Sequence, residues 1–165
     1  MKNKSIKFAL YLNYFVFAIL LNSVGIVIKQ AIDNYNIGET DASILEAFKD
    51  LPIAIVSFFV ASFLPKIGYK KSMLLSLSLV FFGCMYMYFG NTFGSSKILF
   101  LTIGVAFAFI KVSVFSMIGL LTETKEEHSS FMSYIEGFFM VGIALAYFIF
   151  PVFFDENNPL FGRKS

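Results

Sequence analysis

The chain has 165 residues, of which 58% are hydrophobic and 15% charged, and its net charge is +2. This composition excludes an ordinary soluble domain, and lysines in short clusters between apolar runs do not form the basic face of a nucleic-acid-binding protein. One cysteine, Cys84, and one histidine, His128, leave nothing from which to build a disulfide, a metal site or a histidine-based catalytic centre, so we expect no enzyme, metal or cofactor.

Five apolar runs follow one another along the chain, each of about the length that crosses roughly 30 Å of hydrocarbon as a helix. They cover residues 8–28, 44–64, 73–89, 98–121 and 131–154. The first run exceeds the core of a signal peptide and has no clear cleavage site, so we expect it to be retained. Cys84, inside the third run, is expected to be a small buried hydrophobe. The sequence predicts an all-α integral membrane protein in a lipid bilayer, with one membrane domain over residues 1–154 and a polar tail over residues 155–165.

The lysines between the runs indicate the orientation of these helices. The clusters at residues 2–7 and 66–71, together with Lys125, fall on one side of the membrane if the five helices alternate. The positive-inside rule makes this side cytoplasmic, and the loop over residues 33–41 then lies outside. Twelve lysines beside a single arginine hint at an A+T-rich bacterial genome. We therefore expect a multi-pass protein of the bacterial inner (plasma) membrane with a cytoplasmic N-terminus.

Local signals mark helix starts and close helix contacts. Two pairs have the spacing of a capping box: Ser43 with Glu46, and Thr124 with Glu127. Two pairs of small residues lie four positions apart: Gly104 with Ala108, and Gly142 with Ala146. Such pairs would let neighbouring helices approach closely.

Lys111 is the most informative residue, because it lies alone in the middle of the fourth run, where an ionisable side chain is costly and by default functional. Lys111 is roughly 16 Å from the cytoplasmic end of its helix and Glu136 roughly 9 Å from the start of the next, antiparallel one. We hypothesise that the two side chains pair directly or across a water-filled cavity. The alternative is a buried ion pair that only fixes helix register. Asn22, deep in the first run, could likewise bind a polar solute or bond a neighbouring helix.

A polar stripe enters the second run from its outer end. Glu46, Lys49 and Asp50 share one helix face, which continues through Ile53 and Ser57. We expect the stripe to line a solute or coupling-ion cavity, with Asp50 the member most readily assigned a function. In the alternative interpretation, Glu46 only caps its own helix and Lys49 extends toward the headgroups.

The link between the second and third runs, residues 61–71, resembles the signature loop of the major facilitator superfamily, which reads Gly-x-x-x-Asp-Arg-x-Gly-Arg-Lys. Lys66, Gly68 and Lys70 match the pattern in kind. The link departs from the pattern at Ala61, Pro65 and Tyr69. The rhythm of the spans, the long loop after the first and the Tyr-Lys pair look most like the fucose-permease-like sugar transporters, over about residues 8–154.

This resemblance implies a symporter or uniporter that moves a small polar solute by alternating access between two helical halves. Sugar–proton symporters of this kind use an acidic residue in the first helix, and that position falls on Gly25. Their acidic position in the fourth helix falls on Lys111, and a polar position in the fifth helix falls on Glu136. The reversed sign at Lys111 suggests a different coupling ion or solute, either sugar-like or anionic. The antiporter signature of related exporters is not present in residues 137–151, so drug export ranks lower.

The number of spans bears on completeness. Five helices correspond to the first five of a six-helix half, so we expect a fragment that lacks its C-terminal half and cannot transport alone. The competing interpretation is a self-contained five-helix protein that binds partner subunits, with Lys111 and Glu136 serving assembly. A channel has little support, because no ring of like charges is seen. The residues do not determine the solute, the coupling ion or the direction of transport.

Overall fold

The computed structural model describes residues 2–90 and 92–154, and all regular structure in these residues is helical. The helices are α1 (Lys2–Asn22), α2 (Val24–Tyr35), α3 (Glu39–Ile67), α4 (Tyr69–Gly90), α5 (Phe93–Leu121) and α6 (Lys125–Phe154). Five spans in the described residues are long and apolar enough to cross a membrane, with α1 and α2 sharing the first. The predicted all-α membrane fold is therefore confirmed.

The helices extend beyond the apolar runs. α6 has 30 residues and is therefore roughly 45 Å long, well above the roughly 30 Å of hydrocarbon. The helical hydrogen-bond pattern continues into polar residues at the helix ends, which an apolar run does not include.

The sequence predicted one continuous helix for the first span. This prediction was wrong, because Ser23 separates α1 from α2. The Ser23 hydroxyl donates a hydrogen bond to the carbonyl oxygen of Leu20 at 2.6 Å. The Asn22 amide donates to the carbonyl oxygen of Ala18 at 2.8 Å. Polar side chains that bond to the preceding turn compete with the backbone ladder and bend helices. The break falls where two such side chains are adjacent, whereas a single one, at Asn13, leaves α1 continuous.

One of the two expected caps is confirmed. The Thr124 hydroxyl accepts a hydrogen bond from the backbone N–H of Glu127 at 3.1 Å, at the start of α6. The cap at Ser43 was wrong, because α3 already begins at Glu39 and the Ser43 hydroxyl donates to the Glu39 carbonyl at 2.7 Å. Acidic residues in the first turn of α3 extended the helix beyond the apolar run on which the prediction rested.

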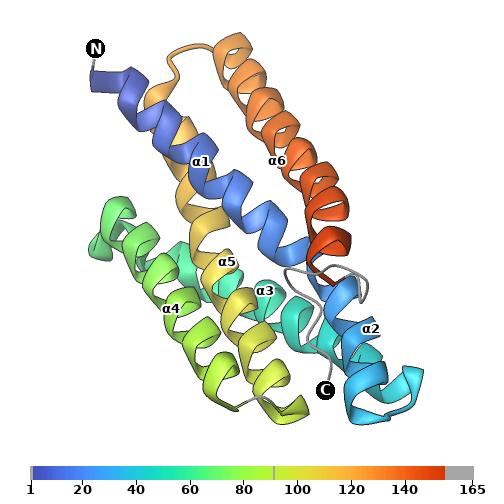
Figure 1. Ribbon diagram of the computed structural model, residues 1–165. Helices are drawn as coiled ribbons and strands as arrows, with labels where there is room; N and C mark the ends of the chain where they lie inside the picture. The colour runs from blue at the N-terminus through green and yellow to red at the C-terminus, as the bar shows by residue number, and fades with distance from the viewer. Residues whose placement is uncertain (1, 91, 155–165) are drawn as a thin grey trace.

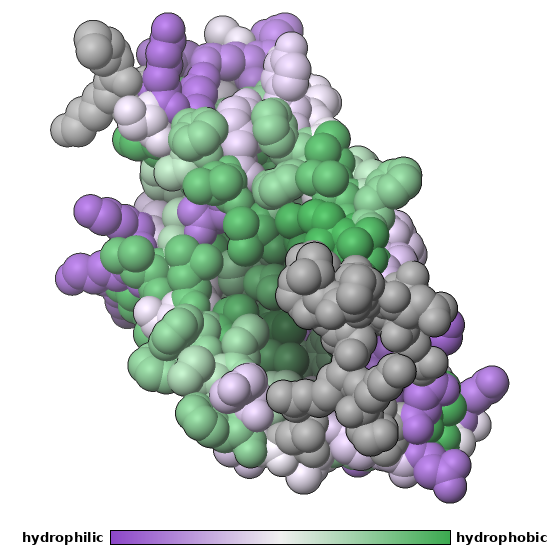
Figure 2. Space-filling view, viewed as in Figure 1, coloured by the Kyte–Doolittle hydropathy of each residue, from purple (hydrophilic) through white to green (hydrophobic). Residues whose placement is uncertain are grey.

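α5 is the central helix of the bundle, as Figure 1 shows. α3 and α4 pack closely along it, α1 crosses its other side and pairs with α6, and α2 lies against α3. Half of the most apolar stretch of α5 is buried inside the bundle, whereas only about a tenth of the most apolar stretch of α3 is buried. On the face seen in Figure 2, apolar side chains fill the middle of the bundle, and polar ones gather toward its edges. Cys84, expected to be buried, is exposed on α4.

Glycines let the helices cross closely, as the small-residue pairs predicted. A Cβ atom on Gly104 would lie 2.3 Å from the backbone oxygen of Lys49 in α3. A Cβ atom on Gly142 of α6 would lie 2.7 Å from the Cβ of Ala18 in α1. Contacts this short exclude any side chain, so these two glycines set the α3–α5 and α1–α6 distances.

Candidate functional site

Lys111 is exposed on α5 and makes no ion pair or hydrogen bond with the described residues. Residues one and two turns earlier on the same helix face are buried. Phe107 packs against the ring of Tyr14 in α1, and Gly104 packs against the backbone of α3. Lys111 therefore lies on the side of α5 between its contacts with α1 and α3.

Tyr14, which the sequence analysis did not single out, is the described hydrogen-bond partner of Glu136. Its hydroxyl donates to Glu136 Oε1 at 3.5 Å, linking α1 to α6. Its ring lies against Phe107 and Phe115, one turn before and one turn after Lys111, with ring centroids 5.8 Å and 6.0 Å away. Lys111, Tyr14 and Glu136 are thus level with one another across three helices.

The hypothesised pair of Lys111 and Glu136 is absent from the described residues, whose two ion pairs are Lys7 with Glu127 and Lys49 with Asp50. Tyr14 packs on the residues one turn before and after Lys111, and its hydroxyl donates a hydrogen bond to the Glu136 carboxylate. The depths of Lys111 and Glu136 along their helices could be counted from the sequence. The contact of Glu136 with an aromatic side chain from a third helix could not be found in this way. A tyrosine in an apolar run is an ordinary residue, so no sequence signal identified it.

The α3 stripe is placed where α3 crosses α5. Lys49 Nζ lies 3.4 Å from Asp50 Oδ1, and the Lys49 side chain is 12% exposed against 60% for Asp50. Glu46 is exposed one turn nearer the start of the helix. The Lys49 backbone forms the close contact with Gly104. The two opposite charges compensate each other, so this end of α3 contributes no net charge from the pair.

Two buried side-chain oxygens lack a hydrogen-bond partner among the described residues, Asn13 Oδ1 on α1 and Ser57 Oγ on α3. Asn13 directly precedes the tyrosine that is level with Lys111. α3 crosses α5 where Lys49 meets Gly104. Ser57 lies about 12 Å along α3 from Lys49, and Lys111 lies about 10 Å along α5 from Gly104. Asn13 is therefore close to the level of the unpaired ammonium. Ser57 is not, because Phe63, six residues after it on α3, contacts Phe109, which precedes Lys111 on α5.

The signature-like loop is a single residue between two helices. Gly68 has φ of +89°, and its N–H donates to the carbonyl oxygen of Leu64 at 2.9 Å, which closes α3. A residue with a side chain would be strained at this φ. Lys66 and Lys70 are exposed on either side of the turn. Asn22, by contrast, bonds within its own helix.

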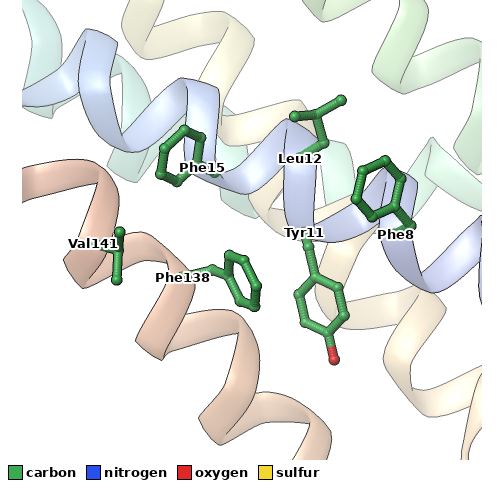
Figure 3. A pocket seen from close by; sticks show the side chains of 6 residues that line it. All are labelled: Phe8, Tyr11, Leu12, Phe15, Phe138 and Val141. Atoms are coloured by element: carbon green, nitrogen blue, oxygen red, sulfur yellow. The ribbon is translucent and has the colours of Figure 1, made fainter. Parts of the chain in front are cut away.

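A groove of about 320 Å³ lies between α1 and α6, and Figure 3 shows its lining. The lining residues are Phe8, Tyr11, Leu12, Phe15, Phe138 and Val141. The groove is apolar, so it does not suit a polar solute. Its lining residues do not include Lys111, Tyr14 or Glu136.

A family model described as Major Facilitator Superfamily matches residues 10–158, which include nearly all of the five spans. No curated protein and no solved structure matches the chain significantly.

Proposed function

Because the chain belongs to the Major Facilitator Superfamily, a family of transporters, we propose that it moves a small anionic solute across the membrane by alternating access, with Lys111 as the charged contact. The observation that carries this proposal is an ammonium group within an apolar span that has no described partner. A charge at such a depth is costly and is kept where it binds something. The unpaired oxygen of Asn13, which directly precedes Tyr14, could bond a hydroxyl group of the same solute.

The lack of an ion pair at Lys111 favours an anion over a neutral sugar. Glu136, which is level with Lys111, accepts a hydrogen bond from Tyr14, and Asp50 pairs with Lys49, so no carboxylate of the described residues forms an ion pair with Lys111. We assign Asp50, Lys49 and the exposed Glu46 to the outer approach to this site. Asn22, which bonds in its own helix, contributes to the break in the first span.

A second group of helices would complete the solute path. Lys111 is exposed in this bundle, and an ammonium exposed to lipid would be strongly unfavourable. The side of α5 between α1 and α3 is therefore expected to face other protein or water. Transporters of this superfamily place the solute between two helical halves. The resemblance of about residues 8–154 to the fucose-permease-like sugar transporters implies a sugar-like solute, and the unpaired Lys111 adds the preference for an anion, so we propose a sugar acid.

The orientation can be tested by chemical labelling. In a Cys84→Ser background, a cysteine replacing Lys125 should react with a membrane-impermeant maleimide only after the cells are permeabilised. A cysteine replacing Thr40, in the exposed start of α3, should react in intact cells. The opposite pattern would place the N-terminus outside the inner membrane and contradict the positive-inside assignment.

The transport proposal is tested with two solutes that differ by one carboxylate. The natural locus is expressed whole in a strain without sugar uptake, and accumulation of radiolabelled glucuronate and glucose is compared. We expect glucuronate uptake above that of cells with an empty vector, and little glucose uptake. Uptake of glucose alone would contradict the anionic assignment. Uptake of neither, together with stable association of the chain with other membrane subunits, would favour the assembly role.

A further inference from the structure

We infer that Tyr14 is a positioning residue, which holds the Glu136 carboxylate away from Lys111 and so keeps the Lys111 charge available to an anion. The inference rests on the proposed function, and it adds a residue that determines the sign of charge the site accepts. Tyr14 is 3% exposed, and its hydroxyl makes the described hydrogen bond to Glu136.

Packing fixes the Tyr14 ring from three directions. Phe107 and Phe115 of α5 contact it at centroid distances of 5.8 Å and 6.0 Å, and Phe139 of α6 contacts it at 4.9 Å. Phe139 follows Glu136 by three residues, so both lie on the same side of α6. The phenol ring is thereby held between α5 and α6, level with Lys111 on one helix and hydrogen-bonded to Glu136 on the other.

The charges explain why such a clamp matters. A carboxylate and an ammonium level with each other in an apolar bundle attract strongly, because little water screens them. The described residues nonetheless show no pair between them. Tyr14 supplies a neutral donor to the carboxylate, and its bulky ring packs on Phe107 and Phe115, one turn before and one turn after the lysine. Removing only the hydroxyl would leave the ring in place and leave Glu136 without its described donor, so that Lys111 becomes its best remaining partner.

The full chain can be tested by nuclear magnetic resonance after ¹³C reductive methylation of its lysines, with Lys111 assigned by the signal lost in Lys111→Arg. We expect Tyr14→Phe to move the Lys111 resonance and to lower glucuronate uptake at least about tenfold, as expected when one charged contact is neutralised. Adding Glu136→Gln to Tyr14→Phe should restore both. Glu136→Gln alone should leave the Lys111 resonance in place, which keeps the test decisive if Tyr14→Phe does not fold.

Tyr11→Phe is the matched control. Tyr11 lies one turn earlier on α1, its ring stacks on Phe138 at 4.9 Å, and its hydroxyl makes no described hydrogen bond. This variant should behave as the wild type. An unmoved Lys111 resonance in folded Tyr14→Phe, or a moved one in Glu136→Gln, would overturn the inference while leaving anion transport intact. Loss of the transport proposal would instead appear as glucuronate uptake that does not depend on Lys111.

Discussion

Replacing Lys111 with methionine is expected to abolish glucuronate uptake in cells that express the whole natural locus. The variant protein should stay folded in the membrane. The ammonium is the one charge at its level that has no described partner, so its removal takes away the proposed attraction for an anion. Truncating one member of a desolvated charge pair costs about 2–5 kcal/mol, which corresponds to a loss in affinity on the order of 30-fold or more.

Stability should not fall with this substitution, because methionine has nearly the same length and is well tolerated in an apolar span. Uptake and the thermal midpoint of the purified protein are the two measurements. Lys29→Met is the control, since Lys29 is also an exposed lysine, on α2, without a described partner. Undiminished uptake in Lys111→Met would refute the proposed role. A loss of folded protein would indicate that Lys111 serves structure instead.

Replacing Gly104 with leucine is expected to prevent the bundle from folding as observed. Even a Cβ atom would lie 2.3 Å from the Lys49 carbonyl oxygen and 3.2 Å from the Pro52 Cβ. The first neighbour is backbone inside α3, so relief requires the whole helix to move. Overpacking against mobile side chains costs about 1–3 kcal/mol, and a clash with fixed backbone should exceed about 3 kcal/mol.

The measurement is the thermal midpoint and the yield of monodisperse protein in detergent. Gly119→Leu is the control on the same helix, because a Cβ atom there would meet nothing within 4 Å. We expect the control to retain the wild-type midpoint. If Gly104→Leu melted like Gly119→Leu, the close α3–α5 crossing would be wrong.

Part of the candidate site could be found from the sequence. Lys111 and Glu136 stood out because charges are rare in apolar runs, and Gly104 and Gly142 because small residues permit close crossings. The partner of Glu136 did not stand out in the sequence. Tyr14 is one of eight tyrosines in the chain, and it contacts a residue 122 positions away. The break at Ser23 was also missed, because hydropathy continues unchanged across it.

The sequence by itself determined that the protein is a bundle of five membrane-spanning helices, because a bilayer demands about 20 apolar residues per span and leaves a backbone no hydrogen bonds except its own. These are properties of each segment alone. Only the tertiary structure decided that α5 is central, that Cys84 is exposed, and that Glu136 bonds to Tyr14 and not to Lys111. Lipid and protein interior are equally apolar, so hydropathy does not show which face of a helix meets a neighbour. Shape and close packing between helices decide that choice, and they exist only once the helices are assembled.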